Sequence, residues 1–282
     1  MIAPLTNPDV LKSVLASNKI QASKALGQNF LICEEVIDAV LLGLTGAPKN
    51  ITELGPGLGT LTQGLIAHDY HVRGIEKDDE FVHILPTMLP PKLRDNLTVI
   101  HGDLKEVDWT WPSSAKASAG DAYSLLGNIP YNLSGLIIRR LTKLQTPPYC
   151  AIFLMQKEVV DRMVMHDKSM SLLPLSVGLW GSAELLLQVP PSCFIPQPKV
   201  HSSVVLLRPS QSALPAAKRE EILAKAKPFF QAKRKQIGTV LKKNYIKTTE
   251  EISAIEKATS ISAERRPETL STKEWVTITD LL

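Results

Sequence analysis

The chain has 282 residues, of which 44% are hydrophobic and 21% charged, and its formal net charge is +4. This composition is typical of a globular protein with an ordinary core, and it excludes disordered and collagen-like chains. No apolar run approaches the roughly 20 residues of a membrane-spanning helix, and the N-terminus lacks the layout of a signal peptide. We therefore expect a cytoplasmic protein.

The three cysteines, Cys33, Cys150 and Cys193, form no Cys-x-x-Cys pair and are odd in number. This pattern predicts neither a disulfide framework nor a zinc site, and we expect ordinary buried or half-buried thiols.

Near the N-terminus, a polar arm over residues 19–31 ends in the cluster Gly-Gln-Asn-Phe-Leu. The helical spacing of the apolar residues that follow predicts a helix from Glu34 to Leu44.

A short strand from Ile51 then runs into a glycine-rich turn, Gly55-Pro56-Gly57-Leu58-Gly59, and a helix is expected from about Thr60 to Ala67. Glycines let the backbone approach a ligand closely, and a helix N-terminus attracts an anion. The spacing is Gly-x-Gly-x-Gly and not the Gly-x-Gly-x-x-Gly of dinucleotide folds, which disfavours a nicotinamide oxidoreductase. Glu53, just before the turn, suits a cationic centre, so a sulfonium with an amino-acid end fits both features.

Carboxylates end the next two predicted strands. Glu76 closes the strand that begins at Tyr70 and follows Gly55 by 21 residues, which is the position of a ribose-binding acid. Asp103 follows the strand over Leu97–His101 and can accept from the amino group of an adenine ring. Glu76 alone can equally be a solvated residue, but the three successive strand ends together indicate a nucleoside–amino acid ligand.

The fourth strand leads into Gly127-Asn128-Ile129-Pro130-Tyr131-Asn132. The side-chain carbonyl of Asn128 and a neighbouring backbone carbonyl can both accept from a planar exocyclic amine. Pro130 restricts the loop, and the Tyr131 ring can stack on a base. The alternative is a plain strand-to-helix turn with an Asn cap.

A continuously apolar stretch from Tyr149 to Met155 predicts a strand buried on both faces. Two further strands, over residues 184–189 and 202–207, are expected to pair antiparallel. The proline-rich loop between them carries Phe194, which can stack on a flipped base or lie buried under the loop.

Helical patterns follow the linker over residues 211–215. Residues 206–282 hold 15 basic and nine acidic residues, and Lys218–Lys247 holds ten and two. A basic segment next to a near-neutral body indicates a polyanionic partner, although a solvated helix face remains an alternative. We expect phosphate contacts from a set of exposed cations in this segment: Lys233, Arg234, Lys235, Lys242 and Lys243.

Several motifs spanning nearly the whole chain resemble the small-subunit (16S) ribosomal RNA adenine dimethyltransferases. They are LGQNFL (26–31), ELGPGLGTLT (53–62), GIEKD (74–78), GNIPYN (127–132), MQKEVVDRM (155–163), VPPSCFIPQPKVHSSVV (189–205) and RRPETLS (265–271). The resemblance implies an α/β fold, namely a seven-stranded Rossmann-like class I methyltransferase domain over residues 1–210. It also implies a small helical, RNA-binding domain over residues 211–282.

The resemblance also implies site residues. The methyl donor, S-adenosyl-L-methionine, is assigned to residues near the strand ends: Asn29, Leu31, Gly55, Gly57, Glu76, Asp103 and Asn128. The target amine is assigned to Asn128, Pro130 and Tyr131, and base stacking to Phe194. No metal is expected to take part.

The implied activity is N6,N6-dimethylation of two adjacent adenosines near the 3′ end of small-subunit RNA, within an immature 30S particle, by a monomer. The sister family that dimethylates large-subunit RNA and confers macrolide resistance is an alternative, because it shares the Asn-Ile-Pro-Tyr loop. A non-catalytic nucleic-acid-binding factor that retains the fold is a second alternative.

Overall fold

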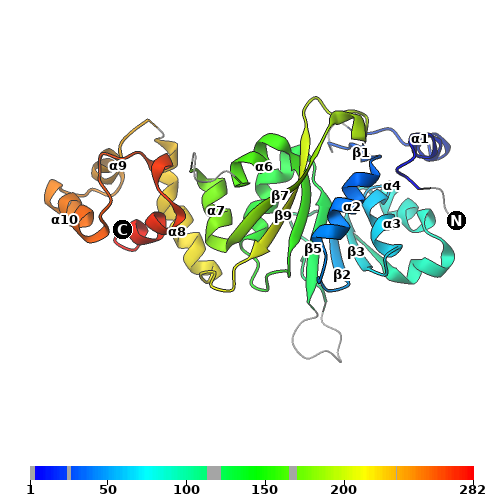
Figure 1. Ribbon diagram of the computed structural model, residues 1–282, viewed down its shortest axis with the longest axis horizontal. Coiled ribbons are helices and arrows are strands. Elements are labelled where there is room, and N and C mark those ends of the chain that lie inside the picture. The colour runs from blue at the N-terminus through cyan, green and yellow to red at the C-terminus, as the bar shows by residue number, and fades with distance from the viewer. Residues whose placement is uncertain (1–3, 24–26, 113–121, 165–169, 233) are drawn as a thin grey trace. The chain divides into compact units, whose positions relative to one another are not determined.

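The computed structural model describes residues 4–23, 27–112, 122–164, 170–232 and 234–282 (Figure 1). The chain divides into two compact units. The first comprises Met1–Leu136, Thr146–Val160 and Glu184–Arg208, and the second Ile137–Gln145, Asp161–Ala183 and Pro209–Leu282. The expected functional division at residue 210 stays a prediction. The compact units differ from this division because the segments Ile137–Gln145 and Asp161–Ala183 belong to the same unit as Pro209–Leu282.

A seven-stranded sheet organises the first unit, with the strand order β4-β3-β2-β5-β6-β9-β7. The first five strands of this order are parallel, and β9 runs antiparallel to β6. The predicted mixed α/β sheet is therefore confirmed. Its strands are β2 Asn50–Leu54, β3 His71–Glu76, β4 Leu97–His101, β5 Tyr123–Asn128, β6 Ala151–Gln156, β7 Gly181–Val189 and β9 Ser202–Pro209.

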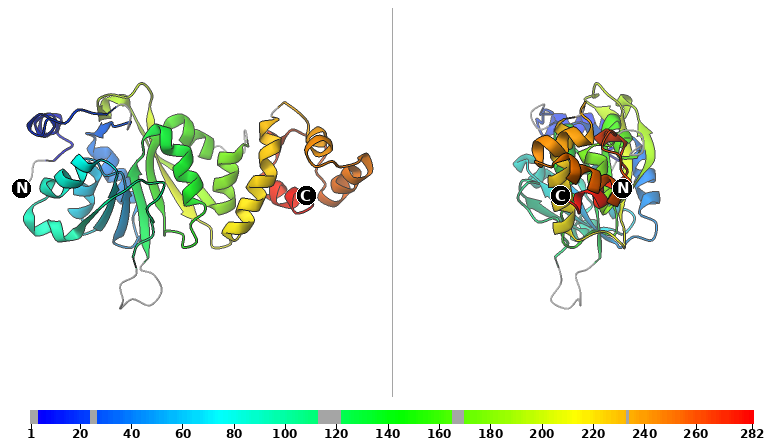
Figure 2. Two further views of the ribbon diagram at one scale, coloured as in Figure 1. Left: turned by 180° about the vertical axis from the view of Figure 1, so that it is seen from behind. Right: turned by 90° about the vertical axis from the view of Figure 1, so that its left-hand side faces the viewer.

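The central strands are buried because their sequences are apolar on both faces. In β6, every residue from Ala151 to Met155 is at most 3% exposed, as expected for a strand covered by helices on both sides. Helices lie on both faces of the sheet (Figures 1 and 2). The helices that begin in this unit are α1 Pro8–Ser17, α2 Glu34–Gly43, α3 Thr60–Ile66, α4 Asp79–Ile84, α5 Ser134–Leu141 and α6 Lys157–Val164, with short 3-10 turns η1 Leu85–Met88, η2 Pro91–Asn96, η3 Tyr131–Leu133 and η4 Pro191–Cys193.

A second, two-stranded sheet joins the start of the chain to the proline-rich loop. Here β1, Phe30–Leu31, pairs antiparallel with β8, Phe194–Ile195. The structure links the flanking Cys33 and Cys193 in a disulfide, with their Cα atoms 5.0 Å apart. The expectation of three unpaired thiols is therefore wrong for these two residues, because the β1–β8 pairing brings together positions that the sequence separates by 160 residues. Cys150 is a free, buried thiol.

The second unit is helical and has its own aromatic core. Phe229 and Phe230 of α8 pack on Trp275 of α11, with ring centroids 5.3 and 4.9 Å apart. Thr248 and Ser271 begin α10 and α11 with capping boxes, which satisfy backbone N–H groups at each helix start. The remaining elements are α7 Leu172–Trp180, α8 Ala216–Gln231, α9 Ile237–Asn244, α10 Thr249–Thr259, η5 Pro267–Thr269 and α11 Thr272–Thr279. Among the residues that the structure describes, no helix is both long and apolar enough to cross a membrane.

Gly127 allows the end of β5 to pass close to β2. A Cβ atom at this position would lie 2.6 Å from the carbonyl oxygen of Leu54 and 2.8 Å from Cδ1 of Ile129. We expect Gly127→Ala to lower the free energy of unfolding by about 1–3 kcal/mol, the usual cost of overpacking. Urea unfolding measures this change.

Gly135, in the first turn of α5, provides the matched control, because a Cβ atom there would meet nothing within 4 Å. Gly135→Ala is expected to leave stability unchanged or to raise it by about 0.5–1 kcal/mol. Equal stability of the two variants would contradict the close approach at Gly127.

Candidate active site

A pocket opens at the carboxyl ends of β2, β3, β4 and β5, the edge of an open α/β sheet where ligands bind. Its walls come from the glycine-rich turn after β2, the loops after β3 and β4, the loop after β5, and the segment that enters β1. The predicted donor-site residues line it, and so do two residues that follow Asn128 in the target-amine motif: Asn29, Leu31, Gly55, Gly57, Glu76, Asp103, Asn128, Pro130 and Tyr131.

The glycine-rich turn has a backbone conformation that strongly favours glycine. Gly55, Gly57 and Gly59 have φ values of 69°, 56° and 90°, which lie in the left-handed region. A Cβ atom built at Gly55 or Gly57 would meet no atom within 4 Å. The turn therefore leaves open space beside its backbone, as a cradle for a ligand requires.

The Glu76 carboxylate is held in place by three backbone amides. Oε2 accepts from Gly57 at 2.9 Å, and Oε1 accepts from Lys77 at 2.8 Å and Asp78 at 2.9 Å. Burial raises the pKa of Glu76, while these hydrogen bonds oppose the rise. Oε2 keeps a further lone pair with which it can accept from a hydroxyl group.

Glu53 is a second buried carboxyl beside the same turn. It is 1% exposed and accepts a hydrogen bond of 2.6 Å from the hydroxyl of Thr62. Burial raises its pKa to about 7. The Thr62 bond lowers this pKa, and the negative charge of Glu76 raises it further. A cation bound in the pocket would stabilise the ionised form of both carboxyls.

Asp103, after β4, accepts a hydrogen bond from the backbone amide of Lys105 at 2.8 Å and forms an ion pair of 2.9 Å with Lys77. These two contacts lower the pKa of Asp103. Ile75 and Leu104 supply apolar surface next to it. An ionised carboxylate beside apolar walls can bind a planar ring that carries an amino group.

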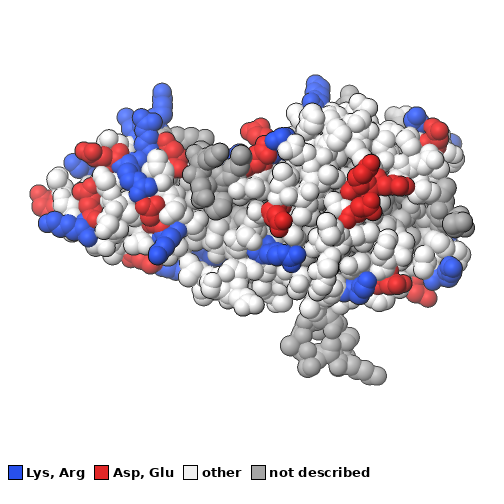
Figure 3. Space-filling view, in the orientation of Figure 1, with Lys and Arg blue, Asp and Glu red and all other residues white. Residues whose placement is uncertain are grey.

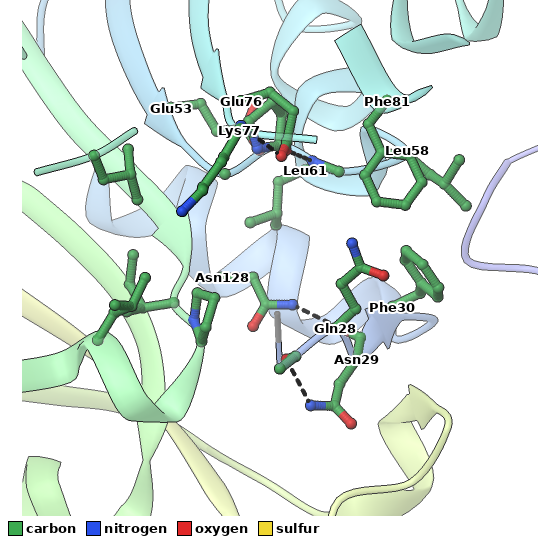
Figure 4. Close-up of a pocket in the computed structure, with 18 of the residues that line it drawn as sticks. Gln28, Asn29, Phe30, Glu53, Leu58, Leu61, Glu76, Lys77, Phe81 and Asn128 are labelled. Carbon is green, nitrogen blue, oxygen red and sulfur yellow. Dashed lines mark hydrogen bonds between the residues drawn. The ribbon is translucent and has the colours of Figure 1, made fainter. Parts of the chain in front are cut away.

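The orientation of Asn128 is fixed by the N-terminal arm. Its Nδ2 donates to the backbone carbonyl of Asn29 at 3.0 Å, and Nδ2 of Asn29 donates to the carbonyl of Gly27 at 3.1 Å (Figure 4). This bond engages one of the two N–H groups of Nδ2 and fixes the orientation of the amide, so Oδ1 is the atom that can accept from a ligand. The two segments touch closely, since a Cβ atom at Gly27 would lie 3.3 Å from Cβ of Pro130.

The two aromatic residues differ in position. Tyr131 lines the pocket, and its hydroxyl lies 2.7 Å from Oγ of Ser202 on β9. Phe194 is 1% exposed and packs in the main core. This is the alternative in which the ring lies under its loop, because β8 pairs Phe194 with Leu31. Base stacking by Phe194 stays a prediction that requires the ring to be uncovered.

Four of the predicted RNA-binding cations lie in the described part of the second unit. Arg234 and Lys235 precede α9, and Lys242 and Lys243 occupy its last turn with exposed side chains. Lys233 lies outside the described residues. Other lysines of the basic segment are engaged locally: Lys218 pairs with Asp280 at 2.8 Å and Lys225 with Glu221 at 2.6 Å.

The sequence did not identify the partners that position the site residues. Lys77 pairs with Asp103, Thr62 with Glu53, and Ser202 with Tyr131. Of these partners, only Lys77 could have been suspected from the sequence, because it directly follows the predicted site residue Glu76. Within the described parts of the chain, no cluster of three His, Cys, Asp or Glu residues could hold a metal ion.

Comparison with known proteins decides the family. The sequence model of the family described as ribosomal RNA adenine dimethylase matches residues 19–281. The chain belongs to this family. Two relatives, both named ribosomal RNA small subunit methyltransferase A, support the assignment. The one from Alkaliphilus metalliredigens is 32% identical over 98% of this chain and 96% of its own. The one from Idiomarina loihiensis is 34% identical over 93% of this chain and 88% of its own.

Two solved structures share the fold. A dimethyladenosine transferase from Plasmodium falciparum superposes with a TM-score of 0.75 at 21% identity, covering 88% of this chain and 95% of its own. The 23S rRNA methyltransferase ErmE superposes with a TM-score of 0.68 at 20% identity, covering 90% of this chain and 99% of its own. The expected class I methyltransferase fold is thereby confirmed.

The raised pKa of Glu53 makes stability depend on pH. In the unfolded chain this carboxyl titrates near 4.5, so between pH 4.5 and about 7 the folded protein holds a proton that the unfolded chain has released. The contribution of Glu53 to stability therefore falls as pH rises through this window, by on the order of 3 kcal/mol. We expect Glu53→Gln to remove this part of the pH dependence, as measured by urea unfolding across the window.

Glu184→Gln, at an exposed position on β7, controls for the removal of one carboxylate. It is expected to retain the dependence of the unsubstituted protein. If Glu53→Gln retained it as well, the raised pKa of Glu53 would be wrong.

Proposed function

We propose that this family member dimethylates N6 of two adjacent adenosines near the 3′ end of small-subunit rRNA, within an immature 30S particle. It acts in the cytoplasm as a monomer, with S-adenosyl-L-methionine as donor. The observation that carries the proposal is the orientation of Asn128, whose Oδ1 is left to accept because Nδ2 donates to Asn29. The names of the relatives favour the small-subunit substrate.

The pocket suits this donor in shape and charge. The open space beside Gly55 and Gly57 accommodates the amino-acid end, whose ammonium group the buried Glu53 would balance. Glu76 would accept from the ribose hydroxyls, and Asp103 from the adenine amino group. When bound, the donor supplies a methyl group on a positively charged sulfur, and the adenine N6 takes this group and loses a proton to water.

The target-amine loop then acts by positioning. The lone pair of an adenine N6 is delocalised into its ring. Hydrogen bonds from N6 to Oδ1 of Asn128 and to the carbonyl of Ile129 or Pro130 favour a pyramidal nitrogen with its lone pair free. Holding this nitrogen in line with the methyl group lowers the barrier without a strong general base. The second transfer requires the loop to admit an amine that already carries one methyl group.

The two alternatives are less well supported. The alternative of a large-subunit substrate is supported only by the shared Asn-Ile-Pro-Tyr loop and by a similarity in fold to ErmE at 20% identity. A non-catalytic binding factor would not need the left-handed glycines or the buried carboxylates of the donor pocket. Mass spectrometry of unmethylated small-subunit and large-subunit RNA, each incubated with the protein and the donor, distinguishes all three. Dimethyladenosine is expected only in the small-subunit RNA.

Asn128→Ala removes the acceptor oxygen and is expected to lower the rate of methyl transfer by roughly 100-fold or more. Donor affinity, measured by calorimetry, should fall only in part, because the other donor-site residues remain. Asn132→Ala, at an exposed position of the same loop, is the matched control and should retain transfer. Near-normal transfer by Asn128→Ala would overturn the role of this residue.

The cations beside α9 are predicted to contact RNA phosphates. Replacing Arg234 and Lys235 by Glu should weaken binding to the 30S particle at low salt, and should lower the slope of log affinity against log salt by about one for each phosphate that is no longer bound. Lys257→Glu, in the last turn of α10, is the control for charge reversal. Unchanged affinity of the double variant would exclude this surface.

A further inference from the structure

Ile246, in the loop between α9 and α10, combines two unusual properties. Its φ angle is 52°, in the left-handed region, and its side chain is 86% exposed. A β-branched residue is strained at such an angle, and glycine or asparagine usually occupies it at the end of a helix. Of the other described non-glycine residues with positive φ, none is β-branched: Lys19, Asp69 and Ser260.

The fold does not need this side chain. The residue before it, Tyr245, stacks on Phe229 with ring centroids 5.5 Å apart, and its hydroxyl donates to the carbonyl of Lys225. The amide of Lys247 donates to the carbonyl of Leu241 at 3.2 Å, and Thr248 caps the next helix. These neighbours fix the loop on both sides and hold Ile246 out into solvent.

The charges around Ile246 favour a polyanionic partner. Lys242 and Lys243 form the last turn of α9, and Lys243 has no ion-pair partner among the described residues. Of the neighbouring acids, Glu251 is paired with Lys247 at 3.3 Å, and Glu250 lies close enough to Lys242 for their opposite charges to attract. Several basic side chains lie around α9 and the segment that leads into it, with acidic side chains among them (Figure 3). Since α9 has eight residues, its two ends lie about 12 Å apart, so cations at both ends and Ile246 can reach one stretch of RNA.

We propose that Ile246 is an apolar RNA contact, which packs against ribose or base surface in the shallow minor groove of an rRNA helix while Lys242 and Lys243 bind the adjacent phosphates. The minor groove of A-form RNA is wide and exposes these surfaces. A single apolar side chain between lysines suits an RNA partner better than a protein partner. A protein-binding surface would instead present a contiguous apolar patch. This proposal rests on the proposed rRNA substrate.

The test is Ile246→Gly, because glycine relieves the backbone strain while it removes the apolar side chain. A purely structural role predicts equal or higher stability and unchanged binding. An RNA contact predicts equal or higher stability and an affinity for unmethylated 30S particles about tenfold lower, a factor that corresponds to roughly 1.4 kcal/mol. The slope of log affinity against log salt should not change, whereas Lys243→Ala should lower it by about one.

Two further variants complete the test. Ile246→Asn, a polar residue that tolerates the left-handed angle, should show the same reduced affinity. If asparagine restored full affinity, the reduction with glycine would reflect chain flexibility and the proposal would fail. Leu42→Ala is the control for removing an exposed apolar side chain, since Leu42 is 74% exposed on α2, and it should bind normally.

Binding of deproteinised small-subunit rRNA distinguishes RNA from protein as the partner. The proposal predicts the same reduction for Ile246→Gly on the bare RNA, and a reduction confined to the particle would instead assign Ile246 to a ribosomal protein. Both binding measurements are made without donor. Methyl transfer by the unsubstituted protein therefore tests the proposed function separately. If Ile246→Gly binds the particle as tightly as the unsubstituted protein does, the role of Ile246 is wrong, and the proposed function is not affected.

Discussion

The hydrogen bond from Nδ2 of Asn128 to the carbonyl of Asn29 joins residues that lie 99 positions apart in the sequence. It fixes which end of the Asn128 amide faces the pocket, and it ties the N-terminal arm to the loop after β5. Because the amide of Asn128 has both a donor and an acceptor end, an unrestrained side chain could present either to a ligand. The rest of the site depends on this choice, since an acceptor there suits an amine.

Buried carboxylates are the second constraint on the site. Glu53 and Glu76 are almost completely buried, and the charge of Glu76 raises the pKa of Glu53. Burying a charge without a partner is unfavourable. The three backbone amides on Glu76 and the hydroxyl of Thr62 on Glu53 compensate only in part. A cationic ligand would remove the remaining repulsion, and the proposed sulfonium donor carries such a charge.

The features that the sequence predicted are those encoded locally. Apolar runs locate the strands, and the residue after each strand lies at the ligand edge, so Glu76 and Asp103 could be placed without a structure. The glycine-rich turn carries its own spacing signal. The resemblance to a known family then supplied Asn29 and Leu31, which no periodicity would have indicated.

The features that the sequence missed depend mainly on the two-residue strands β1 and β8. Strands this short have no detectable alternation, so their pairing cannot be seen in advance. That pairing buries Phe194 and brings Cys33 to Cys193. The bond between Tyr131 and Ser202 was missed for a related reason, because it joins a loop to a strand 71 residues away.

The β1–β8 pairing also sets an order of events during synthesis. Phe30 and Leu31 form one wall of the pocket, yet their strand partners are Ile195 and Phe194. A nascent chain that has emerged only as far as β5 already carries the glycine-rich turn, Glu76, Asp103 and Asn128. It cannot yet hold the N-terminal wall in its paired position. The pocket is therefore completed only after about two thirds of the protein has left the ribosome.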